Sequence, residues 1–247
     1  MIEFEQAIRT ADGSMVTHFA CDAEPARRSL VIVLMDAPGI REALHAIARR
    51  IAADGYLVAL PNLYYRTHRA LTIGPTRDHP DAAGNRELIG RMVSTLGNAK
   101  VASDVGALMD LVAAQKMASA PRVGLVGYCM SGAFAVAAAA AFPDRIACAA
   151  SYFGTRLVTD APESPHRIAS RAKGELYFAF AEQDPYVPAQ QVEQLRANLA
   201  AQGKPCRIET YPGTTHGFVF ADRGTYHEEG AARHWSTLLE LLAHNLG

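Results

Sequence analysis

A cysteine at a strand-to-helix junction is the residue of this chain best suited to act as a nucleophile. Cys129 lies in the spacing Gly127-x-Cys129-x-x-Gly132, after an apolar run that ends at Val126 and before an alanine-rich tract. A sharp turn from strand to helix lifts one side chain above a sheet, and glycines relieve crowding in such a turn. Ser131 occupies the place of the second glycine in a Gly-x-nucleophile-x-Gly pattern, and serine is small enough to serve there. Because a cysteine after an apolar strand is more often a small buried side chain, a nucleophile also needs partners elsewhere.

Two later residues could supply these partners. Asp184 follows a strand-like run in "AEQDPYVP", and His216 lies in the glycine-flanked "YPGTTHGFVF" after the next such run. Nucleophile, acid and histidine occur here in the order of triads built on a parallel sheet, and both partners follow strands at the edge where ligands bind. The pattern predicts that His216 transfers a proton and that Asp184 orients its imidazole. The simpler interpretations are a helix-capping aspartate and an ordinary loop histidine.

These motifs together resemble a known family. "DAPGIR", "LPNLYYR", "GYCMSG", "AEQDPYVP" and "THGF" occur in the order found in the dienelactone hydrolases, a family of α/β-hydrolases, and the similarity covers almost the whole chain. The resemblance implies a Cys129, Asp184 and His216 triad that hydrolyses a small ester or lactone through a thioester acyl-enzyme. It implies no cofactor and no metal. A thioesterase or acyltransferase of the same fold, a hydrolase-like protein that only binds a small ligand, and a redox-sensing thiol are the alternatives.

The segment "LMDAPGI" is the expected source of one amide of an oxyanion hole. Pro38 has no N–H, so we expect the amide of Ala37 to act together with that of Met130, directly after the nucleophile. In the family that this chain resembles, a glutamate aligned with Asp36 contacts the resting thiol, and Asp36 places a carboxylate on a shorter side chain. A helix N-terminus and His216 favour a thiolate at Cys129, whereas burial and Asp36 disfavour it, so its resting state stays open.

Tyr64 and Arg223 are candidates to line the substrate pocket. Dienelactone-opening members of the family hold a substrate carboxylate with arginines, one of them shortly after the histidine. Here residues 217–220 are "GFVF", and Arg223 comes slightly later. A neutral ester or lactone and a charged dienelactone are therefore both open as substrates.

The elements that must position these residues follow from hydrophobic patterning. Short apolar runs predict strands at 29–35, 56–61, 122–126, 146–153, 175–181 and 206–212. Helical spacing predicts helices at 41–53, from a cap at Ser103 and Asp104 onward, at 131–142, between the last two strands, and at the C-terminus. Residues 65–90 and 154–173 are expected to be long loops, and a lid role for 65–90 stays open. Alternating strands and helices predict an α/β-hydrolase fold, with a mostly parallel sheet covered by helices on both faces.

Composition limits the class of protein. The 247 residues are 49% hydrophobic and 20% charged, which favours one globular domain over residues 1–247. The formal net charge of -1 gives no electrostatic reason to expect nucleic acid or a membrane surface as partner. The acidic N-terminus lacks the features of a signal peptide, so we expect a cytoplasmic protein with a small-molecule substrate. Its four cysteines have no metal-ligand or disulfide spacing. The oligomeric state cannot be predicted.

Overall fold

The fold is built on one eight-stranded sheet. The computed structural model describes residues 1–22, 28–67, 82–119 and 121–247. The strand order is β1-β2-β4-β3-β5-β6-β7-β8; β1 and β2 are antiparallel to their neighbours, and the other six strands are parallel. The strands are β1 Ile2–Thr10, β2 Gly13–Cys21, β3 Leu30–Leu34, β4 Leu57–Pro61, β5 Val123–Tyr128, β6 Ile146–Tyr152, β7 Glu175–Gln183 and β8 Cys206–Thr215.

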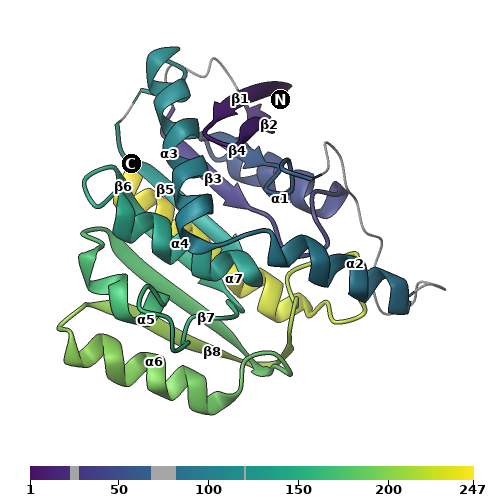
Figure 1. Cartoon of the computed structure of the whole chain (residues 1–247), viewed down its shortest axis with the longest axis vertical. Coiled ribbons are helices and arrows are strands. Elements are labelled where there is room, and N and C mark those ends of the chain that lie inside the picture. Colours follow the sequence, from purple (N-terminus) through teal and green to yellow (C-terminus); the bar gives the residue numbers. More distant parts are fainter. Residues whose placement is uncertain (23–27, 68–81, 120) are drawn as a thin grey trace.

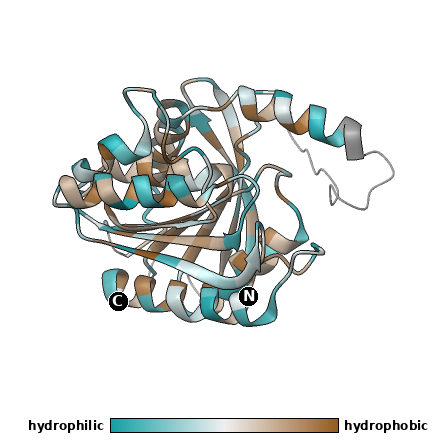
Figure 2. Ribbon diagram, turned by 90° about the horizontal axis from the view of Figure 1, so that it is seen from below, coloured by the Kyte–Doolittle hydropathy of each residue, from teal (hydrophilic) through white to brown (hydrophobic). Residues whose placement is uncertain are grey.

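Helices cover both faces of the sheet (Figure 1). The helices are α1 Glu42–Ala53, α2 Ala82–Ser94, α3 Asn98–Ala114, α4 Met130–Ala141, α5 Pro165–Ile168, α6 Ala189–Ala201 and α7 Glu228–Leu246, with a 3₁₀ turn at Ala169–Arg171. Helix α1 packs on β2 and β4, and α7 packs on β5, β6 and β8. On the other face α4 packs on β3, β5 and β6 and contacts α3 and α5. This arrangement confirms the predicted α/β-hydrolase fold, and Figure 2 shows its apolar residues concentrated in the central strands.

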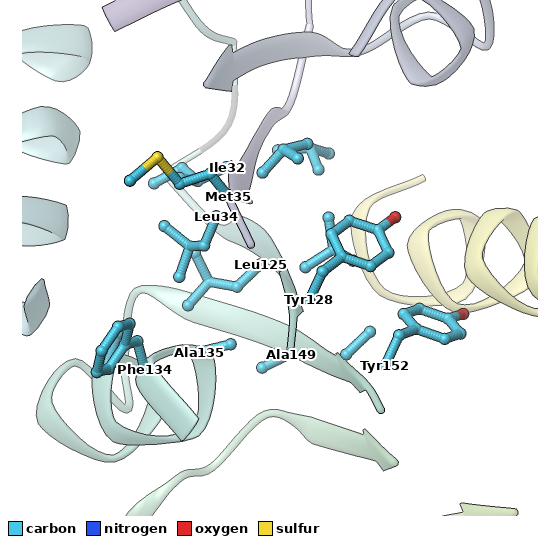
Figure 3. Close-up of a cluster of buried hydrophobic side chains, with 14 of the residues drawn as sticks. Ile32, Leu34, Met35, Leu125, Tyr128, Phe134, Ala135, Ala149 and Tyr152 are labelled. Carbon is cyan, nitrogen blue, oxygen red and sulfur yellow. The ribbon is translucent and has the colours of Figure 1, made fainter. Parts of the chain in front are cut away.

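The central strands are apolar on both sides because both sides are covered. Every residue of β3, β4, β5 and β6 is buried. Alternation along β5 directs Leu125 toward α4 and Tyr128 toward α7, as Figure 3 shows. The Tyr128 hydroxyl lies 2.9 Å from Nε2 of His234 on α7. Burial lowers the pKa of His234 to about 3, so this imidazole is neutral and satisfies the buried hydroxyl.

The structure corrects three expectations about elements and adds one element that was not expected. The added element is the β1–β2 hairpin. The predicted cap at Ser103 and Asp104 is wrong: α3 begins at Asn98, and Asp104 is a buried partner of the Arg66 guanidinium. Helix α2 occupies part of the expected loop 65–90. Residues 68–81 of that loop lie outside the described residues, so the structure does not test whether 65–90 acts as a lid. Helix α5 likewise interrupts the expected loop 154–173.

The described helices also bear on membrane association. Within residues 1–22, 28–67, 82–119 and 121–247, no helix is both long enough and apolar enough to cross a bilayer.

Candidate active site

Cys129 occupies the turn between β5 and α4 in a strained conformation. Its φ of 55° and ψ of −120° lie where a residue with a Cβ is uncommon. Such a conformation costs about 1–3 kcal/mol and persists only when surrounding contacts impose it. The Cys129 N–H donates to the Tyr152 carbonyl at 3.1 Å, and the Cys129 carbonyl accepts from Gly132 and Thr155, each at 3.1 Å. The backbone on both sides of the cysteine is therefore held by neighbouring segments.

Two glycines make this turn possible. A Cβ on Gly127 would overlap the carbonyl of Ser131, and one on Gly132 would overlap the Ser151 hydroxyl and lie 2.6 Å from the Cα of Gly154. Ser131 is fully buried, and its hydroxyl donates to the Met35 carbonyl, which joins the turn to the loop after β3. The Gly-x-Cys-x-x-Gly spacing thus reflects backbone crowding, and Ser131 serves the packing of the turn.

The structure places Asp184 and His216 side by side after β7 and β8. Nδ1 of His216 lies 2.8 Å from Oδ2 of Asp184, and the other oxygen of Asp184 accepts from the Tyr186 N–H at 2.9 Å. The Asp184 side chain is fully buried. The His216 ring stands edge-on to the rings of Phe153 and Tyr186, with centroids 5.0 and 4.8 Å away. These contacts fix the plane of the imidazole and leave Nε2 as its reactive nitrogen.

The charge state of His216 depends on Cys129. Burial lowers the pKa of His216, but its neighbours Cys129 and Asp184 together raise it to about 9. Nε2 is buried and makes no hydrogen bond of ordinary geometry within the described ranges. The interaction between the imidazole of His216 and Cys129 is therefore electrostatic. With a pKa of about 9, the imidazole of His216 is charged at neutral pH.

Ala37 and Met130, the two residues expected to supply oxyanion-hole amides, both contact Tyr64, and Met130 directly follows Cys129 in the chain. Met130 begins α4, so its N–H belongs to the first turn, where amides lack intrahelical acceptors. Tyr64 is fully buried, and its hydroxyl donates to the Ala37 carbonyl at 2.7 Å while its oxygen lies 3.8 Å from the sulfur of Met130. The structure thus places Tyr64 against both of these residues and away from solvent.

Asp36 is the fully buried centre of a network of charges that extends to the surface. Its Oδ1 accepts from Nη1 of Arg41 at 2.6 Å, and its Oδ2 accepts from Nη2 of Arg223 at 2.6 Å. Arg41 also donates through Nε to Asp222 at 2.6 Å, and both guanidinium groups lie over the ring of Phe220, with 4.6 and 5.2 Å to its centroid. We name this set, Asp36, Arg41, Asp222 and Arg223, the charge quartet. It joins the loop after β3 to the loop that follows His216.

Arg41 and Arg156 contribute to this site but were not predicted from the sequence. Arg41 lies within the quoted "DAPGIR", but no feature of the motif reveals its ion pairs. Arg156 follows β6 with a φ of 58°, and it lines a cavity of about 100 Å³ beside Met130 and Phe134 of α4. A non-glycine residue in the left-handed region is the structural signal for a constrained position, and it cannot be read from sequence alone.

Known proteins resemble this chain over most of its length. The sequence profile of the "Dienelactone hydrolase family" matches residues 16–246. A protein of Synechocystis sp. named "Putative carboxymethylenebutenolidase" is 26% identical over 215 residues, 86% of this chain and 84% of that protein. A Salmonella typhi protein of the same name is 29% identical over 218 residues, 87% of this chain and 76% of the other.

Solved structures of other proteins share the fold of this chain. The crystal structure titled "Putative Dienelactone Hydrolase" from Klebsiella pneumoniae has a TM-score of 0.85 and 26% identity, with 98% of each chain covered. A dienelactone hydrolase-like promiscuous phosphotriesterase from metagenomic libraries has a TM-score of 0.79 at 18% identity, with both chains fully covered, which shows a shared fold alone.

Proposed function

Because the chain belongs to the dienelactone hydrolase family, we propose that it hydrolyses a small ester or lactone through nucleophilic attack by Cys129. His216 transfers protons, and Asp184 holds the imidazole and stabilises its charged form. The amides of Ala37 and Met130 bind the oxyanion. These roles, like the single-domain organisation of residues 1–247, are our proposals.

One observation carries this proposal. Cys129 is held at φ 55° at the N-terminus of α4, beside an imidazole that is itself hydrogen-bonded to a buried carboxylate. A cysteine that only fills the core needs neither a strained backbone nor a charged neighbour. The helix N-terminus and the imidazolium both stabilise the thiolate, which is the nucleophilic form.

Acylation begins from the pair of Cys129 thiolate and His216 imidazolium. The sulfur attacks the carbonyl carbon, and the carbonyl oxygen becomes an oxyanion bound by the two amides. When the tetrahedral intermediate collapses, the C–O bond breaks and His216 donates its proton to the departing alkoxide. The products are an alcohol, or the hydroxyl end of an opened lactone, and a thioester on Cys129.

Deacylation returns the enzyme to its starting state. Neutral His216 removes a proton from a water molecule, which attacks the thioester carbonyl within the same oxyanion hole. Collapse of this intermediate expels the Cys129 thiolate beside the imidazolium and releases a carboxylic acid. Asp184 stays ionised throughout and stabilises each charged state of the imidazole.

Intact-protein mass spectrometry after brief exposure to p-nitrophenyl acetate tests the nucleophile. We expect an acetyl adduct on the wild type and on Cys206→Ala, whose cysteine lies in β8 away from the site, and none on Cys129→Ala. Peptide mapping then assigns the adduct to residue 129. An adduct or undiminished turnover in a folded Cys129→Ala variant would refute the proposed nucleophile.

A further inference from the structure

Three side chains with metal-binding groups meet at the opposite edge of the sheet from β8. Glu3 of β1, His18 of β2 and His45 of α1 each offer one ligand atom, and these atoms all lie within 4.8 Å of one another. Oε2 of Glu3 lies 3.1 Å from Nε2 of His18, and the two imidazole rings meet edge to face with centroids 4.4 Å apart. The cluster forms where α1 packs on β2 of the β1–β2 hairpin.

We propose that Glu3, His18 and His45 bind a divalent transition-metal ion, with Zn²⁺ as the reference ion. Two imidazoles and one carboxylate form a donor set that suits zinc and its neighbours in the first transition row. Three protein ligands leave at least one coordination position for water. The three residues are far apart in the sequence and form no short motif, so the sequence analysis predicted no metal site.

One potential ligand atom of this cluster, Nε2 of His18, lacks a well-placed hydrogen-bond partner among the described residues. The side chain of His18 is only 11% exposed, and its Nε2 is buried with no hydrogen bond of ordinary geometry among the described residues, although the Glu3 oxygen is near. A buried polar atom without a good partner is costly, and a bound cation would satisfy the nitrogen and the carboxylate together. The second imidazole is already in contact with the first.

A modest rearrangement converts this cluster into a coordination site. With metal–ligand bonds of about 2.0–2.1 Å, tetrahedral ligand atoms lie roughly 3.3 Å apart, so the side chains must close by rotation. His18 is fixed in a strand with partners on both sides, whereas the Glu3 side chain is 33% exposed and His45 is half-buried. The mobile ligands can therefore close on the fixed one.

One cation already lies near the proposed site. Nη1 of Arg49 is 3.5 Å from Oε2 of Glu3, and its Nη2 contacts Glu42 on the same helix. Because Arg49 is partly exposed and has this second partner, a metal ion can displace it from Glu3 without leaving it unpaired. The ion would then fasten the hairpin at the sheet edge to the first turns of α1.

Zinc titration of metal-free, untagged protein by calorimetry tests the proposal. Because Cys129 and His216 could also take zinc, the titration uses the Cys129→Ala background. We expect one ion per chain with a dissociation constant in the micromolar range or tighter, and at least tenfold weaker binding after His45→Ala or Glu3→Gln. His244→Ala, which removes an exposed histidine near the end of α7, is the control and should bind zinc unchanged.

Two further measurements separate ligation from a general effect on the fold. Co²⁺ in place of Zn²⁺ should give the visible absorption of a low-symmetry nitrogen and oxygen site, and His45→Ala should abolish it. His45→Ala with Cys129 intact should hydrolyse p-nitrophenyl acetate at the unchanged rate, which shows that the variant is folded. The proposal fails if the Cys129→Ala protein binds no zinc, or if both ligand variants bind it as tightly as their parent.

Discussion

At the scale of single residues, the site depends on how His216 is charged. Its pKa of about 9 results from burial, which lowers it, and from Cys129 and Asp184, which together raise it by more. A raised pKa means that the imidazolium is present below about pH 9 and is lost as the pH rises through that value. The proton available for a poor leaving group disappears over the same range.

This charge state predicts a pH profile. For an ethyl ester, whose leaving alkoxide needs a proton, we expect kcat/KM to fall above about pH 9. In Asp184→Asn the fall should move to lower pH, because the negative charge that raises the pKa of His216 is gone. Steady-state rates across the pH range measure both midpoints. The p-nitrophenyl ester, whose leaving group needs no proton, is the control substrate and should show a weaker alkaline fall; an unmoved midpoint in Asp184→Asn would contradict this account.

A second residue-scale prediction concerns Tyr64. Its hydroxyl donates to the Ala37 carbonyl, so it orients the peptide group whose neighbouring amide we assign to the oxyanion hole. Tyr64→Phe should lower kcat roughly tenfold, about 1.4 kcal/mol, with little change in KM, because the lost contact acts on the transition state. Stopped assays over a range of substrate concentrations separate the two constants. Tyr226→Phe, at an exposed position, should leave both unchanged, and an altered KM alone in Tyr64→Phe would argue for substrate binding.

At the scale of elements, the turn from β5 to α4 is held by backbone crowding. Gly127→Ala places a methyl group onto the Ser131 carbonyl, which is backbone and cannot rotate away. We expect a loss of unfolding free energy of roughly 2–4 kcal/mol and loss of hydrolysis, because the turn must open to admit the Cβ. Urea denaturation followed by circular dichroism measures the change. Gly224→Ala, where nothing lies within 4 Å of an added Cβ, should be neutral, and equal stability of the two variants would show that the crowding is unimportant.

The elements differ in how far their sequences predict them. The buried strands β3 to β6 are continuous apolar runs, so their position and the turns that follow them can be read directly. The hairpin of β1 and β2 was missed because β1 alternates apolar and charged residues and is largely exposed, which resembles a polar segment. The Asp12-Gly13 pair, where the turn enters β2, was the available sequence signal. Sequence alone favours a capping role for Asp104, because its partner Arg66 is distant in the sequence and their ion pair cannot be predicted from local spacing.

At the scale of the whole molecule, the charge quartet connects parts of the chain that sequence patterns cannot relate. Asp36 and Arg223 are separated by 187 positions, yet they form an ion pair with a fully buried carboxylate. The order of nucleophile, acid and histidine could be predicted because each follows a strand. The ion pairs could not, because they depend on how two loops from distant strands approach one another in the folded chain.

Because the charge quartet joins two loops, we expect the unfolding free energy of the whole chain to depend on Arg41. Arg41→Met removes the ion pairs of Arg41 with Asp36 and Asp222, so the buried Asp36 carboxylate keeps Arg223 as its cationic partner. We expect the unfolding free energy to fall by about 3 kcal/mol. Arg145→Met, which removes an exposed ion pair with Asp110, is the matched control and should cost less than about 1 kcal/mol.

Urea denaturation measures the unfolding free energy of both variants. The double variant Asp36→Asn with Arg41→Met should recover part of the loss, because the buried side chain at position 36 is then neutral. If Arg41→Met costs no more than the surface control, the quartet does not hold the two loops together, and the position of His216 then depends on Asp184 and on the aromatic contacts of Phe153 and Tyr186.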